Sequence, residues 1–393
     1  MKERILVLTR LAPWTLAGGA RIRNHWMIRA LAARYRVDLV LTEPHVSVPQ
    51  EYVHMLESVE VIPPTQQSWG ARVRDALVKR QPLYAAGIVS ERLQTAVANL
   101  LARHRYLAIQ TDLNMQAAIP ETTTVPIVYN AHNCETALQR RHARAAGLPL
   151  GPLLAWDARR LAEFERRMLE RSALITACSL DDLRDLHALA LRADERAVLI
   201  PNGVDLAHYR DIREDAFEPR RLLITGSMDW RPNQQGLFWF LDEVLPFLHA
   251  HDATLTVRVA GRMDAAFAQK IARYPGITAI AHPADLREEL ERAQLILAPI
   301  TASSGTRLRI LEAWAAGRPV VTTHFGAMGL EYEDGRELLT CDTPQTFVDA
   351  IVTLLNSPEQ WHAIRNAAKQ RVVQYDWAPI GEQLLAAYER LSP

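Results

Sequence analysis

The chain has 393 residues, of which 49% are hydrophobic, and its 45 Lys and Arg residues balance 45 Asp and Glu residues. This length exceeds what one hydrophobic core usually serves, so we predict two globular domains. No apolar run approaches the roughly 20 residues of a membrane-spanning helix. The three distant cysteines, Cys134, Cys178 and Cys341, support neither a disulfide framework nor a zinc site, and they indicate a reducing, cytoplasmic location.

The charge is unevenly distributed along the chain. Up to Arg171 there are 23 Lys and Arg against 15 Asp and Glu, and the remainder holds 22 against 30. Basic residues gather at 139–145 and 158–171. These stretches indicate either a solvated, salt-bridged helix face or a binding surface for an anionic membrane or a phosphorylated acceptor. No nucleic-acid-binding motif accompanies them, so nucleic acid is not an expected partner.

In the first half of the chain, short apolar runs alternate with helical patterns. The N-terminus lacks the features of a signal peptide and indicates a first strand at 5–9. Short strands separated by helices predict parallel βαβ units. The expected strands are 5–9, 37–41, 59–62, 108–111, 127–130, 174–177 and 198–201, and the clearest helices are 21–35, 91–104 and 154–171.

A stretch rich in Pro, Asn, Gly and charge then indicates an interdomain connection. A second α/β alternation follows, and two such doubly wound domains are expected to hold a ligand at the carboxyl ends of their strands, in the cleft between them. The expected elements are strands 222–225, 254–260, 277–281, 295–298 and 320–323, and helices 234–248 and 380–391. We predict domains at 1–200 and 221–375, a linker at 201–220, and a C-terminal helix at 376–393 that packs back on the first domain.

The most informative motif is a small-residue loop that ends at Gly305 and leads into a helix opening at Thr306. Backbone N–H groups at a helix start and the positive end of the helix dipole favour a bound anion. Arg307 and Arg309 oppose that dipole, which makes more sense if an anion binds there; the alternative for Arg309 is an ion pair with Glu312. A partly buried Glu312 needs a partner, either an arginine or a ligand hydroxyl.

The run SGTRLRILEAWAAGRPVVTT resembles the donor-binding signature of GT-B glycosyltransferases of the retaining family four, the group 1 glycosyl transferases. Three further segments are similar to that family: 226–246, VAGR at 259–262 and PNGVD at 201–205. The resemblance implies an α/β GT-B architecture, with two Rossmann-like doubly wound domains facing a central cleft. The N-terminal domain would bind the acceptor and the C-terminal domain the nucleotide-sugar donor.

The resemblance also implies roles for residues of the second domain. Glu312 would bind the ribose hydroxyls. Neutralising the diphosphate would fall to Arg231, Arg307 or Arg309, of which Arg307 is the expected catalytic residue. Many relatives carry a sugar-contacting Glu eight positions before Glu312, where this chain has Ser304. The donor-binding residues expected in this domain are Gly226, Arg231, Asn233, Gly261, Arg262, Ser304, Gly305, Thr306, Arg309 and Glu312.

Two features of the first domain fit the same family. Gly18 and Gly19 precede a helix and indicate either a simple turn or the loop that approaches the donor diphosphate. Arg21 and Arg23 follow and could serve an acidic group. His132 comes just after a strand and is either a structural histidine or, by the resemblance, a catalytic residue that contacts the transferred sugar.

We therefore predict a glycosyltransferase that moves a sugar from a nucleotide-diphosphate sugar to an acceptor hydroxyl, with retention implied by the resemblance. No Asp-x-Asp pair lies in a suitable loop, and the family generally needs no metal, so no cofactor is expected. The expected setting is polysaccharide or glycoconjugate biosynthesis at the cytoplasmic face of the inner membrane, with a glycan or lipid-linked acceptor. The alternatives are a nucleotide-sugar epimerase of the same fold and a noncatalytic sugar-nucleotide-binding subunit.

Overall fold

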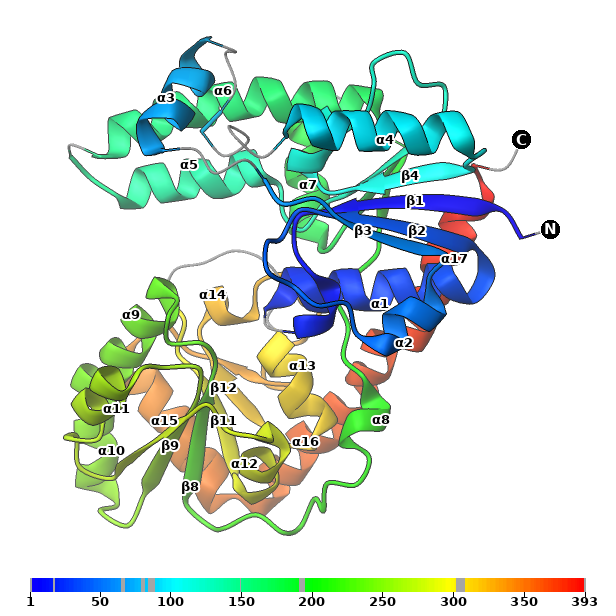
Figure 1. Cartoon of the computed structure of the whole chain (residues 1–393). Coiled ribbons are helices and arrows are strands. Elements are labelled where there is room, and N and C mark those ends of the chain that lie inside the picture. The colour runs from blue at the N-terminus through cyan, green and yellow to red at the C-terminus, as the bar shows by residue number, and fades with distance from the viewer. Residues whose placement is uncertain are drawn as a thin grey trace. The chain divides into compact units, whose positions relative to one another are not determined.

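The protein forms two compact α/β units, each built on one parallel sheet with helices on both faces (Figure 1). The first unit comprises Met1–Asn202 and Ala378–Pro393, and the second comprises Gly203–Trp377. The computed structural model describes residues 2–16, 18–64, 68–78, 82–83, 89–148, 150–190, 195–301 and 308–391.

The sheet of the first unit has seven parallel strands in the order β3-β2-β1-β4-β5-β6-β7. Its central strands are continuous apolar runs because helices cover both faces of a parallel sheet. The strand order reverses between β1 and β4. The strands are β1 Arg4–Thr9, β2 Arg36–Leu41, β3 Ser58–Val61, β4 Ala108–Thr111, β5 Ile127–Asn130, β6 Leu174–Ala177 and β7 Ala197–Leu199.

The described part of the first unit contains eight α-helices, counting α17, which begins one residue before the unit's C-terminal segment. One of them, α17, comes from the C-terminal segment: the buried Tyr388 hydroxyl donates to Gln110 Oε1 at 2.7 Å, and Arg34 pairs with Glu389 at 2.6 Å. The helices are α1 Gly19–Arg34, α2 Gln50–Met55, α3 Trp69–Val78, α4 Glu91–Arg103, α5 Glu135–Ala145, α6 Leu150–Arg171, α7 Leu180–Leu189 and α17 Trp377–Glu389.

The sheet of the second unit has six parallel strands in the order β10-β9-β8-β11-β12-β13, and it reverses between β8 and β11. The strands are β8 Arg221–Thr225, β9 Thr256–Gly261, β10 Ile277–Ala281, β11 Leu295–Ala298, β12 Val320–Thr322 and β13 Leu339–Thr340. The helices are α8 Leu206–Tyr209, α9 Arg231–Trp239, α10 Leu245–His251, α11 Ala265–Ile271, α12 Leu286–Arg292, α13 Leu308–Ala315, α14 His324–Ala327, α15 Pro344–Asn356 and α16 Pro358–Val372.

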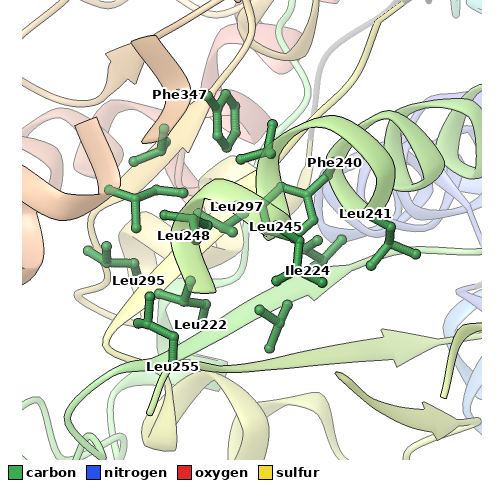
Figure 2. Packing of buried hydrophobic residues seen from close by; sticks show 14 of the residues in the cluster. Leu222, Ile224, Phe240, Leu241, Leu245, Leu248, Leu255, Leu295, Leu297 and Phe347 are labelled. Atoms are coloured by element: carbon green, nitrogen blue, oxygen red, sulfur yellow. The ribbon is translucent and has the colours of Figure 1, made fainter. Parts of the chain in front are cut away.

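Alternate residues of the central strands fill the two faces of this second sheet. Leu222 and Ile224 of β8 lie in one buried cluster, whereas Leu223 lies in the other. Figure 2 shows the first cluster, in which side chains of β8 and β11 pack beside Phe240, Leu245, Leu248 and Phe347. Burial on both faces holds the strand ends, and hence the loops that follow them, in fixed positions within the unit.

The predicted single helix at 234–248 is wrong in one respect. The structure divides it into α9, a π-helical segment Phe240–Val244, and α10. Pro246 lies in the first turn of α10 and has no N–H to donate, and its ring would clash with the carbonyl four residues earlier in a regular helix. A π-helical turn accommodates this conflict.

The predicted linker at 201–220 contributes to the second unit from Gly203 onward. Val204 forms a parallel bridge with Asp376, and its N–H donates to Tyr375 O at 2.8 Å. Short helix α8 follows at once. These contacts tie the start of the second unit to the end of α16.

Gly236 sets how closely α9 approaches the end of β11. A Cβ at this position would lie 1.7 Å from Pro299 O, a backbone atom that cannot turn aside. Alanine normally stabilises a helix by about 0.5–1 kcal/mol relative to glycine, but here overpacking reverses the sign. We expect Gly236→Ala to lower the free energy of unfolding by about 3 kcal/mol or more, measured by urea denaturation.

The matched control is Gly70→Ala in α3, where an added Cβ meets nothing within 4 Å. This variant should unfold at the same or a slightly higher urea concentration than the wild type. Equal stability of Gly236→Ala and the wild type would contradict the close contact between α9 and Pro299.

Candidate functional site

The candidate residues gather where each sheet reverses its strand order. In open α/β sheets, ligands bind outside the carboxyl ends of strands at this switch point. In the second unit the relevant strands are β8 and β11, followed by Gly226 and by the loop that leads to α13. The predicted residues Ser304, Gly305, Thr306 and Arg307 of that loop lie outside the described residues.

Two glycines allow the chain to pass very close to itself beside the end of β8. Gly226 and Gly261 have φ of +137° and +151°, which disfavours any side chain, and the Gly226 N–H donates to Ala260 O at 3.1 Å. A Cβ at Gly261 would lie 2.0 Å from Gly226 O. Both positions therefore require glycine, and they leave bare backbone at the switch point.

Helix α13 brings Arg309 and Glu312 to the same region. Its apolar residues Ile310, Leu311, Ala313 and Trp314 are buried in the core of the unit. Because residues three apart in a helix share a face, Arg309 and Glu312 point together away from that core. The hydrophobic pattern of α13 therefore positions both charged groups.

The Arg309 guanidinium covers Gly226. A Cβ at Gly226 would lie 2.7 Å from Arg309 Nη2, and the same nitrogen donates to Asn233 Oδ1 at 2.9 Å. Asn233 is itself fixed because its Nδ2 donates to Ser227 O at 2.7 Å. Burial lowers the pKa of Arg309 to about 10, so the side chain remains a cation at neutral pH.

Glu312 is a carboxylate with an unused hydrogen-bonding capacity. Burial raises its pKa, and the charge of Arg309 opposes that rise. No residue in the described part of the chain donates a hydrogen bond to it, and Arg309 is bound to Asn233 instead of forming the alternative ion pair. Burial also raises the pKa of the Tyr209 hydroxyl, with the Glu312 charge contributing, so the two side chains are near one another. A half-buried carboxylate without a partner is left poorly satisfied unless a ligand supplies the donor.

Arg262 and Arg231, two other predicted donor-binding residues, are exposed and do not contact Arg309 or Glu312 by any hydrogen bond among the described residues. Arg262 is exposed and forms an ion pair with Asp229, which already neutralises its charge. Arg231 is the exposed first residue of α9. Their donor roles stay predictions.

The switch point of the first unit carries a network of polar side chains around Asp112. Thr9 Oγ1 at the end of β1 donates to Asp112 Oδ2 at 2.9 Å, and His132 Nε2 lies 3.0 Å from Asp112 Oδ1. Asn24 Nδ2 donates to Thr9 Oγ1 and Asn130 Nδ2 donates to Asn24 Oδ1, both at 2.8 Å. Strands β1, β4 and β5 and helix α1 thus meet at one carboxylate.

This network fixes the orientation of the His132 ring. Burial would raise the pKa of Asp112, but the charge of His132 and hydrogen bonds from His132, Thr9 and Asn24 outweigh it and hold the pKa below its usual value. Asp112 is therefore ionised at neutral pH and can only accept, so His132 Nε2 carries the proton that they share. His132 Nδ1 is buried and has no hydrogen-bond partner among the described residues.

Gly18 and Gly19 form the start of α1. Gly18 has φ of +103° and its carbonyl accepts from Arg21 N and Ile22 N at 3.1 and 3.2 Å. The Arg21 guanidinium forms a two-point contact with Glu43 at 2.6 and 2.7 Å. The acidic group that Arg21 serves is thus one of the protein's own.

Arg23 does not bind an acidic group, although the sequence suggested that it could. It is fully buried and donates to neutral oxygens, among them Asn130 Oδ1 at 2.8 Å and Ile200 O at 2.6 Å. These bonds link α1 to the ends of the sheet strands. Its role is to hold the polar network together.

Sequence reasoning missed Asp112, Thr9, Asn24 and Asn130. Asp112 and Thr9 stand at the ends of apolar strands, which is a usable signal. Asn24 lies within a helix, and only the packing of α1 beside β1 and β5 brings it to the network.

Comparison with known proteins places this arrangement in a family. The family model of glycosyltransferase family 4 matches residues 17–208, and that of the group 1 glycosyl transferases matches residues 219–357. The chain belongs to the family 4, group 1 glycosyltransferases. This confirms the resemblance inferred from the signature around Glu312. The boundary between the two family models lies near the boundary between the two structural units.

Curated relatives match parts of this glycosyltransferase. A D-inositol 3-phosphate glycosyltransferase of Corynebacterium urealyticum is 32% identical over 111 residues, which are 28% of this chain and 26% of that protein. A phosphatidyl-myo-inositol mannosyltransferase of Mycolicibacterium smegmatis is 27% identical over 205 residues, 50% of this chain and 52% of that protein. The chain thus spans about a quarter to a half of the length of these two relatives.

Solved structures of similar fold match the whole chain. Sucrose-phosphate synthase from Thermosynechococcus elongatus has a TM-score of 0.72 at 16% identity, with 99% of each chain covered. HepE from Anabaena, in complex with UDP-glucose, has a TM-score of 0.67 at 19% identity and covers 98% of this chain and 99% of its own. The predicted α/β GT-B fold of two Rossmann-like units is confirmed.

Proposed function

We propose that this glycosyltransferase transfers a sugar from a nucleotide-diphosphate sugar to an acceptor hydroxyl, with retention of configuration. The observation that carries the proposal is the unsatisfied Glu312 carboxylate beside the Arg309 cation, both at the switch point of the second unit. A carboxylate that binds ribose hydroxyls and a cation that binds a diphosphate are what such a donor requires. The structural neighbour HepE binds UDP-glucose, a donor of this class.

The proposal assigns each residue a distinct contact. Glu312 accepts hydrogen bonds from the two ribose hydroxyls, and Arg309 neutralises the diphosphate. Gly226 and Gly261 let the ends of β8 and β9 pack together, and Gly226 makes room for the Arg309 guanidinium. His132, oriented by Asp112, contacts the transferred sugar. Arg307 and Ser304 are assigned to the diphosphate and the sugar by the family signature alone.

The reaction breaks the bond between the anomeric carbon and the diphosphate oxygen and forms a bond to the acceptor oxygen on the same face of the sugar. Because the acceptor attacks the anomeric carbon directly, no protein nucleophile takes part, and the acceptor proton passes to the leaving diphosphate. Negative charge grows on the diphosphate as it leaves, and fixed cations and backbone N–H groups stabilise that charge most in the transition state. The proposal includes no metal or other cofactor.

A thermal-shift screen with UDP-, GDP-, ADP- and dTDP-sugars tests the donor. At a donor concentration 100 times the dissociation constant, binding stabilises the folded state by about 2.7 kcal/mol, which raises Tm by about 5–10 °C for a unit of this size. We expect one nucleotide class to produce this shift. No shift with any of the four would contradict the proposed donor site.

Incubation with the identified donor alone separates transfer from epimerisation. We expect slow hydrolysis and no epimerised nucleotide sugar, because the proposed reaction transfers the sugar without changing its ring stereochemistry elsewhere. Formation of an epimerised nucleotide sugar would overturn the transferase proposal. Glycan and lipid-linked acceptors are then compared at saturating donor.

A further inference from the structure

Helices α5 and α6 of the first unit form an antiparallel pair that ends in an exposed apolar tip (Figure 1). Four large apolar side chains lie exposed within nine positions there: Leu148 (87%), Leu150 (51%), Leu153 (53%) and Trp156 (41%). They are a third of the twelve exposed large hydrophobic side chains among the described residues. Single exposed leucines need no explanation, but such a cluster indicates an interaction surface.

The charge around this tip has one sign. Residues 136–162 contain five arginines and one acidic residue, Asp157. Asp157 is buried and accepts a hydrogen bond from Leu83 N at 2.9 Å, so it does not screen the surface. Arg141 pairs with Asp185 at 3.3 Å.

Three of the remaining arginines carry unneutralised charge. Arg140, Arg144 and Arg159 are exposed and form no ion pair with any residue in the described ranges. They line a shallow hollow whose floor consists of the small residues Ala143, Gly151, Ala155 and Ala158. The hollow exists because the helices approach closely, as a Cβ at Gly151 would lie 2.9 Å from Ala143 O.

The combination of arginine, leucine and tryptophan fits some kinds of partner better than others. Nucleic acid would match the arginines but leave the leucines without a role. A second copy of the chain would bring two sets of unneutralised arginines face to face. An anionic bilayer accounts for both the charged and the apolar side chains, because its phosphates attract arginines while leucine and tryptophan enter the interface. No helix in the described part of the chain is long and apolar enough to cross a membrane.

We propose that the α5–α6 tip, residues 140–148 and 150–160, docks on an anionic phospholipid bilayer. Leu148, Leu150, Leu153 and Trp156 enter the interfacial layer, and Arg140, Arg144 and Arg159 contact lipid phosphates around the hollow. Arg160, whose guanidinium carbon lies 4.5 Å from the Trp156 ring centroid, holds that ring at the surface. This membrane contact is independent of which nucleotide sugar the protein binds.

Vesicle flotation of the full 393-residue chain tests the proposal. Vesicles of phosphatidylcholine are compared with vesicles containing 30% phosphatidylglycerol (on the order of a natural anionic fraction), at low and at high salt. We expect binding only to the anionic vesicles, and weaker binding at high salt. The triple variant Arg140→Gln/Arg144→Gln/Arg159→Gln should bind on the order of 100-fold more weakly, since each arginine near the surface contributes about a factor of five.

Matched controls separate the tip from general charge and hydrophobicity. Arg92→Gln/Arg103→Gln/Arg105→Gln removes three exposed arginines of the same unit, and Phe247→Gln/Val373→Gln removes two exposed apolar side chains elsewhere. Both should bind as the wild type does, whereas Leu153→Gln/Trp156→Gln should bind more weakly. Binding that is equal for neutral and anionic vesicles, or that falls equally in the arginine control, would overturn the proposal. A dimer that Leu153→Gln/Trp156→Gln dissociates would assign the tip to a second copy instead.

Discussion

Replacing Glu312 by glutamine is expected to weaken donor binding by about 100-fold without destabilising the protein. The loss reflects charged hydrogen bonds to two ribose hydroxyls, each contributing about 1.5–3 kcal/mol, of which the amide retains a part. The raised pKa of Glu312 shows that ionisation opposes folding at neutral pH, because a carboxyl with a raised folded-state pKa is most favourable below its unfolded pKa. Glu312→Gln removes that cost, so Tm in the absence of donor should be unchanged or higher.

The matched control is Glu337→Gln, which changes another buried carboxylate of the same unit. Glu337 is paired with Arg371 at 3.1 Å and accepts a hydrogen bond from Glu333 N. Its loss should lower the free energy of unfolding by about 1–3 kcal/mol and leave donor affinity unchanged. Isothermal titration and thermal melts distinguish the two patterns. A Glu312→Gln variant that melts earlier and binds donor normally would make Glu312 a structural residue.

Replacing His132 by alanine is expected to lower kcat by about 100-fold with little change in donor affinity. The proposed contact is to the transferred sugar, and a displacement of about 1 Å in the reacting groups is enough for such a loss. In the proposed site, the nucleotide contacts of the second unit chiefly determine donor affinity. Single-turnover rates at saturating donor measure the effect, and a variant with wild-type kcat would remove His132 from the catalytic site.

Asp112→Asn tests whether Asp112 acts through His132. The amide cannot hold the His132 proton as the carboxylate does, so kcat should fall by about 10-fold or more, less than for His132→Ala. Because the folded-state pKa of Asp112 is lowered, its contribution to stability is present above the unfolded value near 3.9 and is lost as the pH falls through the folded pKa. Wild type and variant should therefore differ in urea stability at pH 7 and converge as the pH falls below the lowered pKa of Asp112. A constant difference across this range would indicate that the charge of Asp112 is not involved.

Much of the second unit was predictable because its residues carry local signals. The apolar runs at 222–225 and 295–298 became strands β8 and β11, with bounds that differ by one residue or none. Gly226 and Gly261 were identified from the family signature, and their positive φ and close approach give the physical reason for glycine there. Local periodicity and turn chemistry determine such features, so the sequence alone reveals them.

Features that depend on packing between distant segments were not predictable. Asp112 gains its role only because β1 and β4 pair, which brings Thr9 within 2.9 Å of it. Arg309 lies near Glu312 along the chain, and local reasoning offered Glu312 as its partner, but the fold presents Asn233 of α9 to it. The π-helical turn before α10 was missed because the apolar pattern continues through Pro246, although that proline marks the break.

Helix α17 has a consequence for the order of events during synthesis. The segment Ala378–Pro393 belongs to the first unit, yet the ribosome makes it after all 175 residues of Gly203–Trp377. At about 5–20 residues per second, the first unit waits about 9–35 s for this helix. During that interval Gln110 lacks the Tyr388 hydroxyl, and the surface of α1 that Gly381 contacts at Ala30 is uncovered. The nascent first unit therefore passes through a stage in which it exposes apolar surface, the condition under which folding intermediates aggregate or need chaperones.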